Sequence, residues 1–159
     1  MRSRRTRTPR AWWLIILLVI GCLMAGCSTP GSATQQAARE FPTIDTAKLT
    51  AYQKRFLKVV RAEYLKPKPA TDYAAGITEP WCADFVSWVM RESGAPLRNP
   101  NSGGWRIPGI YTLADYYTSV NRFAGPGSGH VPVTGDVLIY GEGSPFGAHT
   151  NMVLSFAGG

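Results

Sequence analysis

The segment from Trp81 to Val89, W-C-A-D-F-V-S-W-V, predicts an amphipathic helix that carries a cysteine in its opening turn. Pro80 stands just ahead of it, where a missing N–H costs nothing because the first N–H groups of a helix have no partner inside it. Apolar side chains recur at the spacing of one helical face, at Cys82, Phe85, Val86 and Val89. The positive end of the helix dipole favours thiolate over thiol, so Cys82 is a candidate nucleophile. The alternative is a small buried cysteine on a stripe that faces the core.

Two strands are predicted near the other end of the chain. The first is Gly135 to Tyr140, G-D-V-L-I-Y, and the second lies in Gly147 to Ser155, where His149 stands at the start. A cysteine at a helix start, followed much later by a histidine that leads a strand, is an arrangement that can bring an imidazole next to a thiol.

These three motifs, with A-H-T-N-M-V-L-S as the last, resemble the CHAP domain, a family of cysteine- and histidine-dependent amidohydrolases and peptidases that cut bacterial peptidoglycan. The resemblance runs from about Lys48 to the last residue. It implies an α+β, papain-like (NlpC/CHAP-type) fold with N-terminal helices packed on an antiparallel sheet. It also implies Cys82 as nucleophile, His149 as base, peptidoglycan as substrate and no cofactor. The NlpC-type peptidases are the nearest competitor, but there Ser-Gly usually follows the nucleophile, whereas Ala83 and Asp84 follow it here.

The resemblance also implies a third polar residue, Glu, Asn or Asp, which orients the imidazole from the strand after the histidine. Only ten residues follow His149, so this residue is expected beyond Gly159 and the C-terminal strands of the sheet are expected to be missing. Glu142 is an alternative for which the sequence gives no support.

The N-terminus predicts export. Five arginines precede residue 11, and an almost wholly apolar run follows from Ala11 to Gly26. M-A-G-C, which ends at Cys27, resembles the lipobox of bacterial lipoproteins, with Cys22 as a weaker second candidate for acylation. Residues 1–27 are therefore predicted to be a lipoprotein signal peptide, a signal anchor being the alternative. Residues 28–44 are predicted to be a flexible linker, and residues 45–159 the catalytic domain.

Charge and cysteine usage limit the class of protein. The chain has 17 Lys+Arg against 10 Asp+Glu, but five of the basic residues precede residue 11, so the remaining excess is small. We therefore attribute most of the positive charge to the N-terminal targeting segment, and nucleic-acid binding is not predicted. Cys82 has no predicted disulfide partner, which favours a reactive thiol. No metal site is predicted, because one cysteine and two histidines without ligand spacing form no cluster.

Three helices are predicted before the strands. The first begins with a cap at Asp45 or Thr46 and runs toward Leu65, where Pro67 closes it. The second is the cysteine helix, which ends at Gly94. The third begins near Thr112 and Asp115, which form a near capping box. Loops are predicted at 66–75, 100–109 and 124–130.

Trp81 and Trp105 are candidates to line a substrate groove, whereas Trp88 is expected to pack inside the domain. His130, in a Gly-rich loop, is the competitor of His149 for the role of base. Asp136 is expected to be a turn residue.

The predicted function is that of an exported peptidoglycan hydrolase, held at the outer face of the bacterial cytoplasmic membrane, that works through a cysteine thioacyl intermediate. N-acetylmuramoyl-L-alanine amidase and peptide endopeptidase activity are both open. The alternative is a weakly active or inactive cell-wall-binding module tethered to the membrane. Oligomeric state is not indicated by the sequence.

Overall fold

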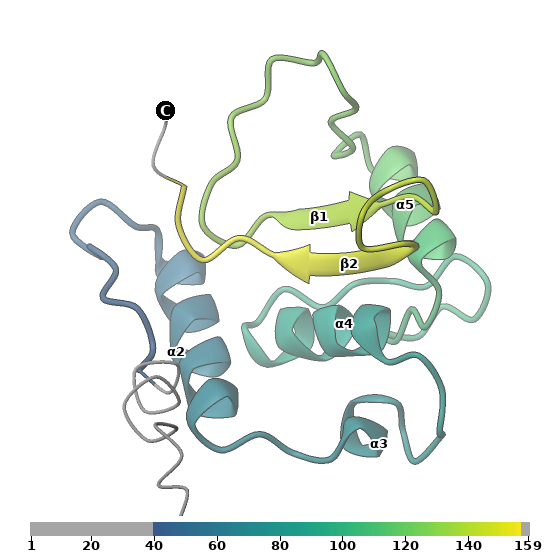
Figure 1. Cartoon of the computed structure of the whole chain (residues 1–159), viewed down its shortest axis with the longest axis horizontal. Helices are drawn as coiled ribbons and strands as arrows, with labels where there is room; N and C mark the ends of the chain where they lie inside the picture. Colours follow the sequence, from purple (N-terminus) through teal and green to yellow (C-terminus); the bar gives the residue numbers. More distant parts are fainter. Residues whose placement is uncertain (1–39, 157–159) are drawn as a thin grey trace, which may run out of the picture. The chain divides into compact units, whose positions relative to one another are not determined.

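The structure, a computed structural model, describes residues 40–156 of the chain. The predicted signal segment with Cys22 and Cys27, most of the predicted linker, and any position after Gly159 lie outside these residues. The elements follow the order α2 (Ala51–Leu65), α3 (Ala70–Tyr73), α4 (Cys82–Glu92), α5 (Ile110–Ser119), β1 (Val137–Tyr140) and β2 (His149–Met152). Helices therefore precede the strands, and the predicted α+β class is confirmed for the described part (Figure 1).

The sheet has two antiparallel strands in the described residues, with Val137 opposite Met152 and Tyr140 opposite His149. Successive side chains of a strand point to opposite faces. Val137, Ile139 and Met152 pack against the buried cluster that includes Val86 of α4 and so define the face that the helices cover. His149 and Tyr140 consequently lie on the other face of the sheet.

Helix α4 is the centre of the core, because α2, α3, α5 and β2 all pack against it. Val86 and Val89 are both fully buried, and each belongs to a different cluster. Val89 joins the cluster formed with α2, and Val86 joins the cluster that includes Leu113 of α5. Met152 of β2 packs against both clusters, so the strand closes the core over the helix.

Helix α2 begins later than the sequence predicted. Its N-cap is Thr50, whose side chain accepts a hydrogen bond from the backbone N–H of Gln53 at 3.2 Å, while the Gln53 side chain accepts one from the Thr50 N–H at 2.9 Å. This reciprocal capping box pairs the backbone N–H groups of Thr50 and Gln53. Asp45 and Thr46 do not cap this helix. Asp45 instead accepts from the N–H of Ala47, in a local turn.

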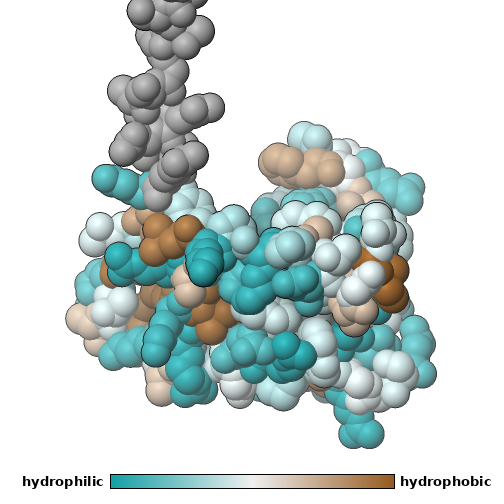
Figure 2. Space-filling model, turned by 90° about the horizontal axis from the view of Figure 1, so that it is seen from below, coloured by the Kyte–Doolittle hydropathy of each residue, from teal (hydrophilic) through white to brown (hydrophobic). Residues whose placement is uncertain are grey.

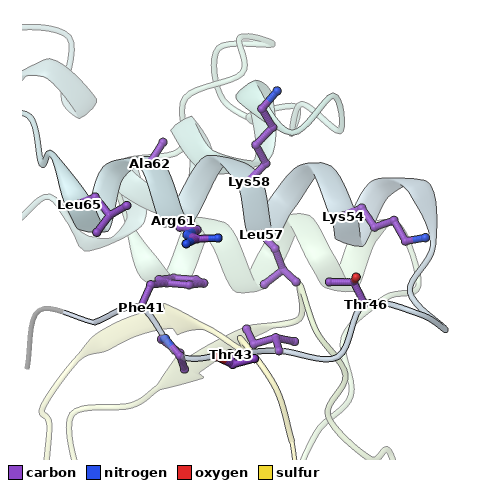
Figure 3. Close-up of a pocket in the computed structure, with 11 residues that line it drawn as sticks. Phe41, Thr43, Thr46, Lys54, Leu57, Lys58, Arg61, Ala62 and Leu65 are labelled. Atoms are coloured by element: carbon purple, nitrogen blue, oxygen red, sulfur yellow. The ribbon is translucent and has the colours of Figure 1, made fainter. Parts of the chain in front are cut away.

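The segment before α2 is part of the packed domain. Phe41 and Ile44 lie against the α2 cluster, so packing begins four residues before the predicted boundary at residue 45. A hollow of about 490 Å³ separates this segment from α2, and Figure 3 shows Leu57 directed into it and Lys58 directed away. Neither an acid, a histidine nor a cysteine lines the hollow, and its charged lining residues are Lys54, Lys58 and Arg61.

A short helix, α3, lies where the sequence predicted only a loop. Its Tyr73 is almost fully buried, and its hydroxyl donates to Glu63 of α2 at 2.8 Å and accepts from the Lys68 N–H at 3.1 Å. Burial and the Glu63 carboxylate raise the pKa of Tyr73 to about 12. Burial acts to raise the pKa of Glu63, but hydrogen bonds from Lys68 and Tyr73 and the Lys68 charge outweigh it and lower that pKa. One tyrosine thus joins α2 to α3 through a buried carboxylate.

The C-terminal end of α4 and the N-terminal start of α5 test the predicted helix caps. Gly94 follows the C-cap of α4 with a φ of +79°, the left-handed conformation predicted for the end of the cysteine helix. Helix α5 begins at Ile110 with Gly109 as N-cap and no side-chain cap, so the predicted capping role of Thr112 and Asp115 was wrong. The fully buried Leu113 fixes the helix against α4 instead.

None of the helices between residues 40 and 156 is long and apolar enough to cross a bilayer. The surface seen from below is mostly hydrophilic, with hydrophobic areas between the polar side chains (Figure 2). Trp81 is one of the large hydrophobic side chains exposed to solvent, at 44%.

Replacing Tyr73 with Phe keeps the ring in its packed position but removes the hydroxyl that donates to Glu63. We expect a loss of about 1–3 kcal/mol in the free energy of unfolding, because a buried carboxylate oxygen loses its donor. Urea unfolding followed by circular dichroism measures it. Tyr116→Phe is the matched control, since the Tyr116 hydroxyl makes no hydrogen bond in the described part of the chain. A loss for Tyr73→Phe no larger than for this control would contradict the prediction.

Candidate active site

Cys82 is the first residue of α4 and is half-buried, with no disulfide partner among the described residues. The first hydrogen bond of the helix runs from the Phe85 N–H to the Trp81 carbonyl at 2.8 Å. The N–H groups of Cys82, Ala83 and Asp84 therefore precede the first internal donor of the helix. The structure agrees with the prediction of a thiol in the opening turn, beside free backbone donors that are able to bind an anion.

His149 is the first residue of β2 and pairs with Tyr140, the last residue of β1. The two rings are nearly parallel, with centroids 6.4 Å apart and an interplanar angle of 23°. The Phe146 and Tyr140 rings meet edge to face, with centroids 5.1 Å apart and an interplanar angle of 66°. An aromatic wall therefore borders the imidazole.

The structure brings the elements that carry the two predicted catalytic residues together, but within the described residues it forms no hydrogen bond between the two side chains. Helix α4 packs against β2, and Figure 1 shows that both begin at the same end. The register of the sheet nevertheless places His149 on the face turned away from α4. Within residues 40–156 no hydrogen bond joins the Cys82 thiol to the His149 ring.

His130 lies at the opposite end of the sheet. Its Nε2 is 2.8 Å from Oδ2 of Asp136, which also accepts a hydrogen bond from the Val133 N–H at 2.9 Å. Asp136 thus closes a turn, in agreement with the sequence prediction, and immediately precedes β1, whereas His149 is paired with the last residue of that strand. Four strand residues, roughly 13 Å, separate the two ends. The His130–Asp136 pair was not anticipated from the sequence.

A cavity of about 1040 Å³ lies between the long loop before β1 and the elements α2, α5 and β1, and it includes His130 and Asp136. Tyr52 lines it and donates to the Met90 sulfur at 3.0 Å. Burial and, to a smaller extent, the Asp136 charge raise the pKa of Tyr52, so this phenol stays protonated near neutral pH. Cys82 does not line the cavity, so its volume is not a measure of space at the thiol.

The two predicted groove residues lie at different places along α4. Trp81 adjoins Cys82, is 44% exposed, and stacks on Tyr73 at 5.7 Å with an interplanar angle of 27°. Trp105 instead lies against Arg91 in the last turn of α4, with the guanidinium carbon 3.9 Å from the ring centroid. Trp81 therefore borders the thiol, whereas the contact of Trp105 is with the other end of the helix. Trp88 packs against Tyr73 at 5.4 Å, as expected of a residue inside the domain.

Three charged residues beside Cys82 were missed by the sequence reasoning. Asp84 is fully buried in the first turn of α4, and Arg106 forms ion pairs with both Asp84 and Glu79. The signal for this cluster was one acid inside an otherwise apolar helical segment, W-C-A-D-F-V. A charge at such a position requires a partner, although the sequence does not say which cation supplies it.

The family model of the CHAP domain matches residues 73–159, from α3 through the cysteine helix and both strands. The chain belongs to the CHAP domain family. CHAP domains are in general peptidoglycan hydrolases of the amidase or peptidase type, which agrees with the resemblance seen in the motifs. No curated protein and no solved structure matches the chain significantly.

We expect Cys82 in the folded protein to react with iodoacetamide near neutral pH faster than free cysteine does, because it lies at a helix start beside backbone N–H groups that are able to bind an anion. Peptide mass spectrometry identifies the labelled cysteine and gives the rate for Cys82 alone. The same protein unfolded in urea is the matched control, since unfolding removes the helix and should reduce the rate to that of free cysteine. Slower labelling of the folded protein would indicate a shielded core thiol.

Proposed function

We propose that this CHAP domain is an exported, cysteine-dependent peptidoglycan hydrolase with a papain-like active site. The observation that carries the proposal is that Cys82 and His149 each begin an element, and that these two packed elements begin at the same end. A thiol in a first helical turn and a histidine at a strand start are the parts that nucleophilic amide hydrolysis requires.

In the proposed reaction the Cys82 thiolate attacks the carbonyl carbon of the scissile amide, after His149 has taken the thiol proton. N–H groups of the first turn of α4 stabilise the oxyanion. The C–N bond then breaks, His149 protonates the leaving amine, and a thioester remains on Cys82. His149 next takes a proton from water, whose oxygen attacks the thioester and releases the acid and the free thiol.

This sequence of steps requires the imidazole to reach the thiol, and rotation of the side chain alone does not change the face of the sheet on which it lies. The backbone at the start of β2 must therefore also change its conformation. His149 is half-buried and is the first residue of the strand, next to the loop after Tyr140, so this change concerns only the end of the strand. Catalytic hydrogen bonds that are long or misaligned in a free enzyme commonly tighten when substrate binds.

The catalytic pair is tested with Cys82→Ala, His149→Ala and the double variant, measured by turnover of purified peptidoglycan. Each should lose activity by roughly 10³-fold or more, and the double variant should be no worse than the single ones, because residues that act as a unit are not additive. His130→Ala is the matched control and should stay near wild-type activity, since His130 lies at the other end of the sheet. Full activity of His149→Ala would remove His149 as the base.

The identity of the released products shows which bond the protein cuts. N-acetylmuramoyl-L-alanine amidase activity frees the stem peptide from the glycan, whereas endopeptidase activity cuts within the peptide and leaves a fragment on the sugar. Mass spectrometry of the released fragments distinguishes the two.

A second candidate function is a cell-wall-binding module with little or no catalysis. The absence of a thiol–imidazole hydrogen bond in the described residues favours it. Such a module would bind peptidoglycan sacculi equally well with Cys82 or with Ala at this position, and neither protein would release soluble fragments.

We further propose that the protein is tethered to the outer face of the cytoplasmic membrane through acylated Cys27, on the sequence of residues 1–27 alone. Mass spectrometry of membrane-extracted protein should find Cys27 as the first residue, carrying diacylglyceryl. Cys27→Ser should abolish this modification and Cys22→Ser, the matched control, should leave it intact. An N-terminus that begins before Arg10 would indicate a signal anchor.

A further inference from the structure

A cluster of three charges surrounds the backbone that carries Cys82. Glu79 lies three residues before the cysteine and Asp84 two residues after it. Arg106 binds both carboxylates: its Nη2 forms an ion pair with Glu79, and its Nε lies 2.7 Å from Oδ1 of Asp84. One guanidinium therefore connects the segment that leads into α4 with the first turn of the helix.

The Asp84 carboxyl group has the Arg106 guanidinium as its ion-pair partner. Its side chain is fully buried, and burial raises the pKa of the Asp84 carboxyl more than the Arg106 charge lowers it. The Nε–Oδ1 pair is close enough for an ion pair but is not aligned as a hydrogen bond, so both Asp84 oxygens and Arg106 Nε have no hydrogen-bond partner within the described residues. The Arg106 charge is therefore the main contact that favours the charged form of this buried carboxyl group.

Arg106 is itself fixed to α4. The carbonyl of Arg106 accepts a hydrogen bond from the Asn99 side chain at 2.7 Å, and the N–H of the next residue, Ile107, donates to the buried Ser87 hydroxyl at 3.1 Å. Ile107 is fully buried in the α5 cluster. The loop that carries the guanidinium is thus anchored to the same helix as the thiol, so the charge bridge is built on a rigid support.

We propose that Arg106 is a positioning residue for the nucleophile, which by binding Glu79 and Asp84 together fixes the backbone on both sides of Cys82. The proposal rests on the proposed cysteine chemistry. Two carboxylates already bind the guanidinium. This favours a role as an internal bridge and not as a binding site for a substrate carboxylate. Lysine cannot replace it, because a single ammonium group does not present the planar, forked donors that reach two carboxylates at once.

Glu79→Gln is the main test, since Glu79 is partly exposed and its loss leaves the buried Asp84–Arg106 pair in place. Arg106→Lys is the second variant. We expect each to lower kcat by about tenfold with KM within about twofold of wild type on soluble peptidoglycan fragments, since misplacing a nucleophile slows the reaction of bound substrate. Glu92→Gln is the matched control: it breaks the exposed Arg91–Glu92 pair at the other end of α4 and should leave kcat unchanged.

A second readout does not depend on turnover. The ratio of Cys82 alkylation by anionic iodoacetate to that by neutral iodoacetamide, at low salt, should rise in Glu79→Gln because a negative charge near the thiol is removed. It should stay unchanged in Glu92→Gln. Thermal unfolding of each variant confirms that the protein under study is folded.

The outcomes separate this inference from the proposed function. Unchanged kcat in both Glu79→Gln and Arg106→Lys, or a change confined to KM, would overturn the positioning role while Cys82→Ala remains inactive. Full activity of Cys82→Ala would instead overturn the cysteine mechanism. If the wild type turns over no substrate, the alkylation experiment still tests the inference. Equal ratios of iodoacetate to iodoacetamide labelling in Glu79→Gln and Glu92→Gln would refute it.

Discussion

The burial of α4 is the constraint on which the rest of the described structure depends. Val86 and Val89 are fully buried in two neighbouring clusters, and each full burial of such a side chain stabilises the fold by about 1.5–3 kcal/mol. Met152 reaches both clusters around them, so the strand can take only a position over the helix. The placement of Cys82 at one end of α4 and of His149 at the start of β2 follows from this packing.

The described residues contain two buried acidic side chains, Glu63 of α2 and Asp84 of α4, and they differ in how their oxygens are paired. Glu63 accepts a hydrogen bond from Tyr73 and pairs with Lys68, so its pKa is lowered in spite of burial. Asp84 has an ion pair with Arg106 but no aligned hydrogen bond, so burial prevails and its pKa is raised. The first arrangement joins secondary-structure elements at little cost. The second places a buried carboxyl group, with Arg106 as its ion-pair partner, two residues from the thiol.

The two halves of the proposed active site are supported differently. The Cys82 half lies on a helix that is packed against four other elements and bridged by charges. The His149 half lies at the end of a two-stranded sheet, beside a loop that is held by its own bonds, such as that from the Ser144 hydroxyl to the Gly147 carbonyl at 2.8 Å. Alignment of the imidazole is therefore the step in which the site has the most freedom, and the thiol is the fixed reference.

Local chemistry in the sequence determined the ends of the cysteine helix, the two strands and the α+β order, because Pro80, Gly94 and the apolar periodicities act over a few residues. It was misleading where two local patterns competed: Asp45 and Thr46 are good caps, but Thr50 has Gln53 at the spacing that completes a capping box. Helix α3 has only four residues, too few for a periodic pattern, and depends on Tyr73 reaching Glu63. Only the tertiary structure decided that Arg106 bridges Glu79 and Asp84, since Arg106 lies 22 positions after Asp84 in the sequence. It also decided the face on which His149 lies, because a strand alternates with a period of two and the choice of face is made by the packing of Met152 and its neighbours on α4.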